Sequence, residues 1–178
     1  MAEKAGAHFA LISNVCLQGL KLAIEFTMPA NVKEKKQKVK QFMHAKDNAV
    51  SALGKIIKFQ SAVVDVKPLI SNWLGLLPIK NDVEEAKLQY EFLAQILQEN
   101  PLLVLGEQYQ NFERIVILLA DITQKKYVSD ETGVKLAGII QNMSKDPTFG
   151  PQFQLIYQNK LTADQQERIN LALKFGSQ

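Results

Sequence analysis

The chain has 178 residues, enough for one compact domain or for about four helical-pair repeats of ~40–47 residues. Apolar residues make up 47% of the sequence and can fill a continuous core, whereas a net charge of +3 is too small to indicate a nucleic-acid-binding protein by itself. The single cysteine, Cys16, excludes an internal disulfide and favours a reducing compartment. The N-terminus lacks the basic start of a secretory signal, and the longest apolar run, residues 115–120, is far shorter than the ~18 residues of a membrane span. We therefore expect a soluble, intracellular protein.

The first two predicted helices are separated by a lysine-rich stretch. Apolar residues recur at the helical period over residues 7–27, and Pro29 ends this helix. Residues 31–40 are either a charged linker or the solvated first turns of the second helix. That helix continues to about Phe59.

Two prolines bound a short third helix. Pro68 fits its first turn, and Pro78 ends it. The apolar residues between them surround the helix almost completely, which predicts packing on several sides. Asp82 is the expected N-cap of the fourth helix, and Glu85 is expected to complete a capping box three positions later.

The second half of the chain has the same alternation of helices and breaks. Pro101 ends the fourth helix, and residues 102–106 are predicted to form an apolar loop between repeats. A fifth helix is expected over about residues 108–125, and a sixth follows the N-cap Ser129. After a shorter helix, the last one begins at Thr162 with a second capping box.

A five-residue pattern recurs in the second, fourth and sixth of these helices. It begins with leucine, includes a small residue and closes with two aliphatic residues, at positions 53–57, 93–97 and 136–140. The copies are 40 and 43 residues apart, a period typical of HEAT and armadillo repeats. We predict an all-α fold, a right-handed solenoid of antiparallel helix pairs.

The repeat alignment also predicts domain organisation and core. The whole chain, residues 1–178, is predicted to be a single repeat segment. Its approximate repeats are 5–60, 61–100, 101–146 and 147–178, the last being a C-terminal cap. Each repeat must cover its apolar face with its neighbours. The residues predicted to be buried are Leu53, Ile56, Leu93, Ile96, Leu97, Leu136, Ile139 and Ile140.

The two ends of the predicted stack differ in polarity. The last helix has one polar face, as a terminal cap requires, whereas the first helix has no comparable face. We interpret the chain as the C-terminal piece of a longer solenoid, with an exposed apolar patch on its first helix.

The sequence offers candidates for partner binding but none for catalysis. It has no phosphate-binding glycine motif, zinc-protease motif or nucleophile elbow, and no catalytic, metal or cofactor residue is predicted. Trp73 is either a groove residue or, more simply, part of the core. The basic candidates, which could equally be a solvated helix start, are Lys33, Lys35, Lys36, Lys38 and Lys40. The acidic candidates could attract basic cargo or only complement a helix dipole, and they are Asp82, Glu84, Glu85 and Glu91.

Four stretches of the chain resemble one family. Residues 47–59, 73–86 and 99–106 look like the karyopherin-β (importin-β) nuclear transport receptors, and in particular the C-terminal repeats of the importin beta-three branch. Residues 161–166 resemble the closing helix of that branch. The segment from Trp73 to Ala86 is the most specific of these stretches.

This resemblance implies a function in binding rather than in catalysis. It implies a superhelix of HEAT repeats that carries cargo proteins into nuclei and shuttles between cytoplasm and nucleus. Phe-Gly nucleoporins would dock in apolar grooves on its convex side. Ran-GTP would bind mainly to N-terminal repeats that this chain lacks, and no direct binding of nucleic acid or membrane is expected. The alternatives are a HEAT-repeat adaptor or scaffold of another complex and, from a different class, a helical enzyme.

Overall fold

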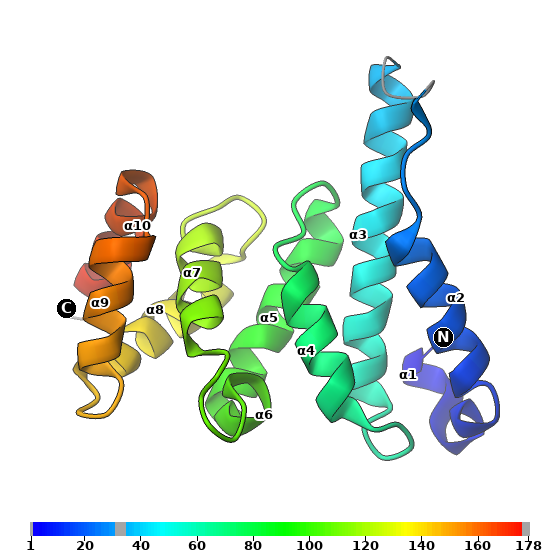
Figure 1. Ribbon diagram of the computed structural model, residues 1–178, viewed down its shortest axis with the longest axis horizontal. Helices are drawn as coiled ribbons and strands as arrows, with labels where there is room; N and C mark the ends of the chain where they lie inside the picture. Colours follow the sequence, from blue (N-terminus) through cyan, green and yellow to red (C-terminus); the bar gives the residue numbers. More distant parts are fainter. Residues whose placement is uncertain (1, 31–34, 176–178) are drawn as a thin grey trace. The chain divides into compact units, whose positions relative to one another are not determined.

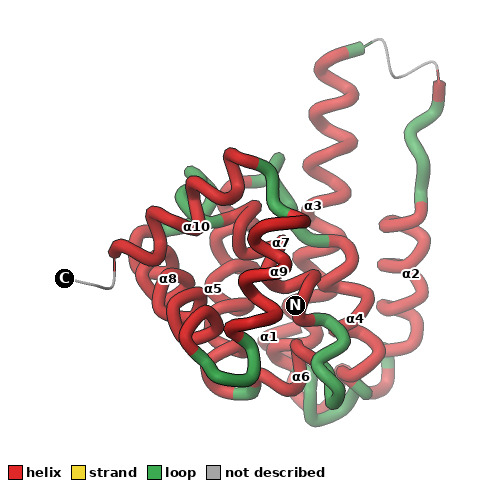
Figure 2. The backbone as a smooth tube through the Cα atoms, turned by 60° about the vertical axis from the view of Figure 1, so that its left-hand side comes forward, coloured by secondary structure: helices red, strands yellow, loops and turns green. Residues whose placement is uncertain are grey.

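The computed structural model describes residues 2–30 and 35–175 (Figure 1). Every regular element within these two ranges is a helix, and none of their residues forms a strand (Figure 2). The predicted all-α class is therefore confirmed, and packed helices of this kind are consistent with a helical solenoid. The chain divides into two compact units, Met1–Gln89 and Tyr90–Gln178, and the division falls inside helix α5 (Val83–Glu99).

The first unit is built around its longest helix, α3 (Lys36–Phe59). Both α2 and α4 pack on α3, and the short α1 also contacts it. The other elements of this unit, besides the start of α5, are α1 (Ala2–Ala5), the 3-10 helix η1 (Gly6–Leu11), α2 (Ser13–Glu25) and α4 (Val66–Leu76).

The second unit contains the rest of α5 and the helices α6 to α10. Both α9 and α10 pack against α7 and also against α8. The helices are α6 (Pro101–Leu105), α7 (Phe112–Ile122), α8 (Asp130–Lys145), α9 (Gly150–Lys160) and α10 (Ala163–Phe175).

The core agrees with the repeat alignment. All eight predicted core residues are buried, and none is more than 7% exposed. Trp73 is fully buried in α4, which confirms the simpler interpretation of this residue as part of the core. The five-residue pattern thus marks the buried face of α3, α5 and α8, where each helix meets its neighbours.

The helix caps agree with the sequence at two of three sites. The Ser129 side chain accepts a hydrogen bond from the Thr132 amide and caps α8. At α10 both halves of the capping box form, because Thr162 and Gln165 each bind the other's backbone N–H. At α5 only one half forms: Asp82 accepts from the Glu85 amide at 3.2 Å. The Glu85 carboxylate is bound by Lys55 instead, so the prediction of a full capping box there was wrong.

A buried carboxylate anchors the turn between α4 and α5. Oδ2 of Asp47, on α3, accepts hydrogen bonds from the backbone N–H groups of Lys80, Asn81 and Asp82, at 3.1 Å for Lys80 and 2.9 Å for Asp82. Asp47 is only 5% exposed. Its negative charge is compensated by these three donors. The same hydrogen bonds attach the turn, which is more than thirty residues away in sequence, to the middle of α3.

The start of the chain differs from the predicted single helix over residues 7–27. Residues Gly6–Leu11 form a 3-10 helix, and the α-helix begins only at Ser13. The Ser13 hydroxyl donates to the carbonyl of Ala10, a local bond of the kind by which serine competes with helical backbone pairing. Four apolar residues of the predicted helix, Leu11, Val15, Leu22 and Phe26, are exposed; that a further repeat covers them stays a prediction.

Two further boundaries differ from the prediction. Residues 102–106 are not a loop, because Pro101 at the first helical position starts the short helix α6. The helix expected over residues 108–125 is shortened to α7, Phe112–Ile122. Tyr109 and Gln124 have φ angles of 55° and 63°, a left-handed conformation that interrupts an α-helix.

Candidate functional site

A groove lies between α2 and α4 in the first unit. The two helices rest side by side on α3 without packing closely on each other, and the space between them is about 740 Å³. Ligand sites in proteins typically have volumes of ~300–1,000 Å³. The groove is lined by Asn14, Leu17, Gln18, Leu20, Lys21, Ile24 and Glu25 from α2, Leu53 from α3, and Leu69, Ser71, Asn72, Gly75 and Leu76 from α4.

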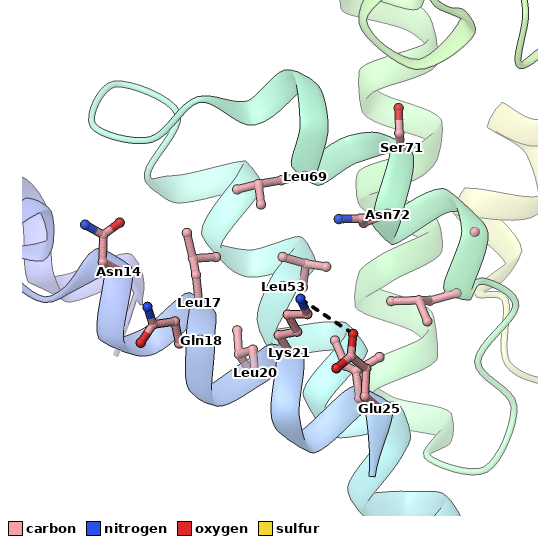
Figure 3. A pocket seen from close by; sticks show the side chains of 13 residues that line it. Asn14, Leu17, Gln18, Leu20, Lys21, Glu25, Leu53, Leu69, Ser71 and Asn72 are labelled. Carbon is pink, nitrogen blue, oxygen red and sulfur yellow. Dashed lines mark ion pairs between the residues drawn. The ribbon is translucent and has the colours of Figure 1, made fainter. Parts of the chain in front are cut away.

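The groove combines an apolar floor with a rim of amides (Figure 3). Leu17, Leu53 and Leu69 come from three different helices and point into the space between α2 and α4. At the rim, the amide side chains of Gln18 and Asn72 are exposed and can pair with peptide N–H and C=O groups. Such a surface fits an extended peptide that carries one or two apolar side chains.

The only charged residues of the lining neutralise each other. Lys21 Nζ lies 3.9 Å from Glu25 Oε1, one helical turn away and exposed to solvent. The groove therefore has no net charge to attract a charged ligand, and its recognition must come from apolar contact and amide hydrogen bonds.

Gly75 has no side chain and so leaves space on the α4 side of the groove. A Cβ atom at Gly75 would have no atom within 4 Å, apart from its own helix and chain neighbours. A side chain added there would therefore begin in open space beside the lining residues.

A polar network behind the groove holds α4 and α5 on α3. The Trp73 indole N–H donates to Gln89 Oε1 at 3.0 Å, and the Gln89 amide donates to Ser51 Oγ at 2.9 Å. The Ser51 hydroxyl donates to the Glu85 carboxylate, which also accepts from Lys55 Nζ at 2.6 Å. Because these groups are mutually satisfied, the network fixes the position of α4 and with it the wall of the groove.

The predicted basic candidates gather at the start of α3. Lys35 is the N-cap residue, and Lys36, Lys38 and Lys40 lie in the first turns, all exposed. Lys33 lies outside the described residues. None of the four described lysines lines the groove.

The predicted acidic candidates have different surroundings. Asp82 and Glu85 are engaged with α3, through a 3.7 Å contact of Asp82 with His44 and through the Glu85–Lys55 ion pair. Glu84 is exposed and pairs with Lys87 at 3.0 Å. Glu91 is exposed two turns further along α5. The structure thus brings Asp82 and Glu85 to α3 and leaves Glu84 and Glu91 facing solvent.

The described residues show no grouping suited to a metal ion or a membrane. Within residues 2–30 and 35–175, no three His, Cys, Asp or Glu side chains are placed to hold a metal. No helix in the same ranges combines the length and the hydropathy needed to cross a bilayer.

Sequence reasoning did not identify the groove. The apolar part of its lining from α2 is formed by Leu17, Leu20 and Ile24 at helical spacing, and this pattern is indistinguishable from that of a buried core stripe. The sequence did contain one signal, apolar residues on two faces of α2: Leu17, Leu20 and Ile24 lie on one face, and Val15 and Leu22 lie on the other. Only one of these faces is needed to pack on α3.

Comparison with known proteins finds a similarity to an importin subunit. No protein-family model matches it. The chain is similar to importin subunit beta-3 of Saccharomyces cerevisiae, with 24% identity over 135 residues. The alignment covers 75% of this chain and 12% of the yeast protein, so the chain corresponds in length to a small part of that relative.

Proposed function

We propose that this chain is a C-terminal helical-repeat segment of an importin-β-type nuclear transport receptor and that it acts by binding proteins rather than by catalysis. The observation that carries the proposal is the similarity to yeast importin subunit beta-3 over three quarters of the chain, on an all-helical structure. The resemblance of residues 73–86 to the same family supports it, because Trp73 at its start forms the buried centre of the first unit's polar network.

The whole receptor would supply the remaining partners. Cargo proteins would bind across several repeats, and Ran GTPase would bind repeats outside this chain. Such a receptor shuttles between cytoplasm and nucleus. Large, shallow contacts from stacked helices are the usual mode of binding of repeat proteins.

Within this chain, the groove between α2 and α4 is the proposed docking site for Phe-Gly segments of nucleoporins. A phenylalanine ring fits the apolar floor formed by Leu17, Leu53 and Leu69. The glycine of the Phe-Gly motif has no side chain, so the peptide backbone can approach the rim of the groove. There, Gln18 and Asn72 can bind the amide groups of the peptide. The absence of net charge in the lining suits a peptide motif that has none.

The test is binding of a fluorescently labelled Phe-Gly repeat peptide, measured by anisotropy. Gly75→Trp should fill the groove. Gly138→Trp is the matched control because a Cβ added at Gly138, on α8, would also meet no atom within 4 Å. Losing one buried apolar side chain costs ~1.5–3 kcal/mol, so we expect Gly75→Trp to weaken binding by about tenfold or more. The control should bind like the parent chain.

A second peptide with serine in place of phenylalanine tests the chemistry of the site. It should bind weakly or not at all, because serine leaves the apolar floor uncovered. Equal binding of the two peptides, or equal binding by the two tryptophan variants, would contradict the assignment of the groove.

A further inference from the structure

The N-terminal turns of α3 stand apart from the other helices of the first unit. This part of α3 extends past α2 and α4 in both views, and the segment that follows α2 runs beside it (Figures 1 and 2). The contact that joins the two is between aromatic rings, since the ring centroids of Phe26 and Phe42 are 6.1 Å apart. We call residues 35–46 the basic arm.

The basic arm carries five positive charges and no negative one. Its lysines are Lys35, Lys36, Lys38, Lys40 and Lys46, and residues 26–30 beside it have no charged side chain. Lys46 lies over the ring of Phe42 at 5.6 Å. Lys35, Lys36, Lys38 and Lys40 form no ion pair with any residue in the described parts of the chain.

Glu34 directly precedes the arm in the sequence, and three acidic side chains on α3 and on elements next to it are already engaged. Asp47 is buried and accepts three backbone hydrogen bonds from the turn before α5. Asp82 contacts His44, and Glu25 pairs with Lys21. The positive charge of the arm is therefore not compensated by these neighbours.

The charges of the arm oppose the local stability of the helix. The positive end of the helix dipole lies at the N-terminus, where acidic residues are favourable and lysines are not. Lys35 makes no side-chain capping bond, the first turn has no acidic residue, and Lys36 and Lys40 repel each other one turn apart. By contrast, α8 begins with the cap Ser129 followed by two acidic residues. Helices α2 and α9 also lack a cap bond and an acidic first turn, but at α3 this lack is combined with lysines at positions 35, 36 and 38.

The distribution of the lysines around the helix limits the kind of partner. Lys36 and Lys40 lie on one side, and Lys38 is turned from Lys36 by roughly 200°, at 3.6 residues per turn. A membrane surface or a rigid duplex can touch one side only. A flexible polypeptide can follow the helix and reach both. The arm also has no arginine, and its one phenylalanine, Phe42, is half-buried and packs against Phe26, unlike the stacking platforms of a typical single-strand-binding site.

We propose that the basic arm, residues 35–46, is a binding site for a flexible acidic polypeptide segment. The acidic chain would neutralise the unpaired lysines and would at the same time bring negative charge to the first turn of α3, which contains no acidic residue. This proposal does not depend on the assignment of the groove or on the transport function.

The experiment uses the full chain and a labelled glutamate-rich peptide, with anisotropy as the readout at several salt concentrations. The patch variant is Lys36→Glu/Lys38→Glu/Lys40→Glu. The matched control is Lys126→Glu/Lys145→Glu/Lys174→Glu, which changes the net charge equally at three exposed lysines of the second unit. We expect about a tenfold or greater loss of affinity in the patch variant and less than about a twofold change in the control.

Hydrogen exchange provides a second readout. Binding of the peptide should slow exchange of the backbone amides of residues 36–46, because the ligand stabilises the helix start. The proposal is overturned if both triple variants lose affinity equally, which would show a general charge effect. It is also overturned if the peptide does not bind, or if anionic vesicles or single-stranded RNA bind through these lysines while the peptide does not.

Discussion

At the residue scale, Arg168 shows how one buried side chain can join two helices, α10 and α7. Its Nε donates to the carbonyl of Ala120 on α7 at 2.7 Å, and its Nη1 pairs with Asp164 in the first turn of α10. The Arg168 side chain is buried, whereas Asp164 is mostly exposed. Beside it, the Gln165 amide donates to Asp121 at 2.9 Å. Together these bonds attach α10 to α7 at two adjacent positions.

The Asp164–Arg168 pair predicts a pH-dependent contribution to stability. The hydrogen bond from Arg168 lowers the pKa of the Asp164 carboxyl below its ordinary value of 3.8. A carboxyl whose pKa is lowered in the folded state stabilises that state above the pKa of the unfolded chain and loses this effect as the pH falls through the folded-state pKa. Asp164→Asn should therefore melt at a lower temperature than the parent at neutral pH, and the difference should shrink below about pH 4.

Thermal melting followed by circular dichroism from neutral to acidic pH measures this effect. Asp130→Asn is a suitable control, because Asp130 also lies in the first turn of a helix but has no arginine four residues later. A difference between Asp164→Asn and the parent that stays constant over the whole pH range would rule out the ion pair as its cause.

At the scale of elements, Gly54 sets the distance between α3 and its neighbours. A Cβ at this position would lie 2.8 Å from Trp73 Nε1 and 2.9 Å from Gln89 Cδ, closer than real contacts allow. The absence of a side chain lets Gln89 bridge Trp73 and Ser51 against the backbone of α3. Gly54 is thus required for close approach and not for an unusual backbone conformation.

Gly54→Ala should destabilise the protein by about 2–4 kcal/mol, because the added methyl group displaces Gln89 and leaves buried polar groups unpaired. Gly138→Ala, on α8, should be neutral or stabilising by up to ~1 kcal/mol, since that position is open and alanine favours the helix. Urea denaturation gives both values. Similar effects of the two substitutions would show that the network tolerates a shift of Gln89.

The sequence was sufficient to predict elements whose signals are local. The apolar period located α3, α5 and α8, and Ser129 and Thr162 located two helix starts, because a capping residue acts on amides three positions away. Glu85 was assigned to its own helix end by the same rule but binds Lys55. That partner is thirty residues away, and no local pattern distinguishes the two destinations of its carboxylate.

The groove could not be predicted for a related reason. It exists because α2 and α4 both pack on α3 while leaving space between them, and helical periodicity specifies which face of a helix is apolar but not how far apart two such faces lie. The lysines of the basic arm were visible in the sequence. Their lack of ion-pair partners in the described chain became clear only from the fold.

At the scale of the whole molecule, the chain consists of two compact units that share helix α5. In repeat proteins, stability is close to a sum of local terms and interfaces between neighbours, so a defect in one region need not unfold the other. The only tryptophan, Trp73, lies in the first unit and reports on it selectively.

Leu136→Ala tests this local character. Leu136 is fully buried in the second unit, and its truncation should cost about 2–5 kcal/mol. We expect the transition followed by circular dichroism to move to lower denaturant more than the transition followed by Trp73 fluorescence. Leu74→Ala, in the first unit, should reverse the order. Identical shifts of both probes in both variants would show that the chain unfolds as one cooperative body.

The hydrogen bonds to Asp47 restrict insertions and deletions in the turn before α5. Three successive amides, those of Lys80, Asn81 and Asp82, must meet one carboxylate oxygen, so the turn before α5 has a fixed length as well as a fixed position. An insertion or deletion of one residue there would move at least one donor away and leave a buried negative charge poorly solvated. Length variation among descendants of this sequence, and any tag or loop graft introduced by an engineer, should therefore avoid residues 79–82.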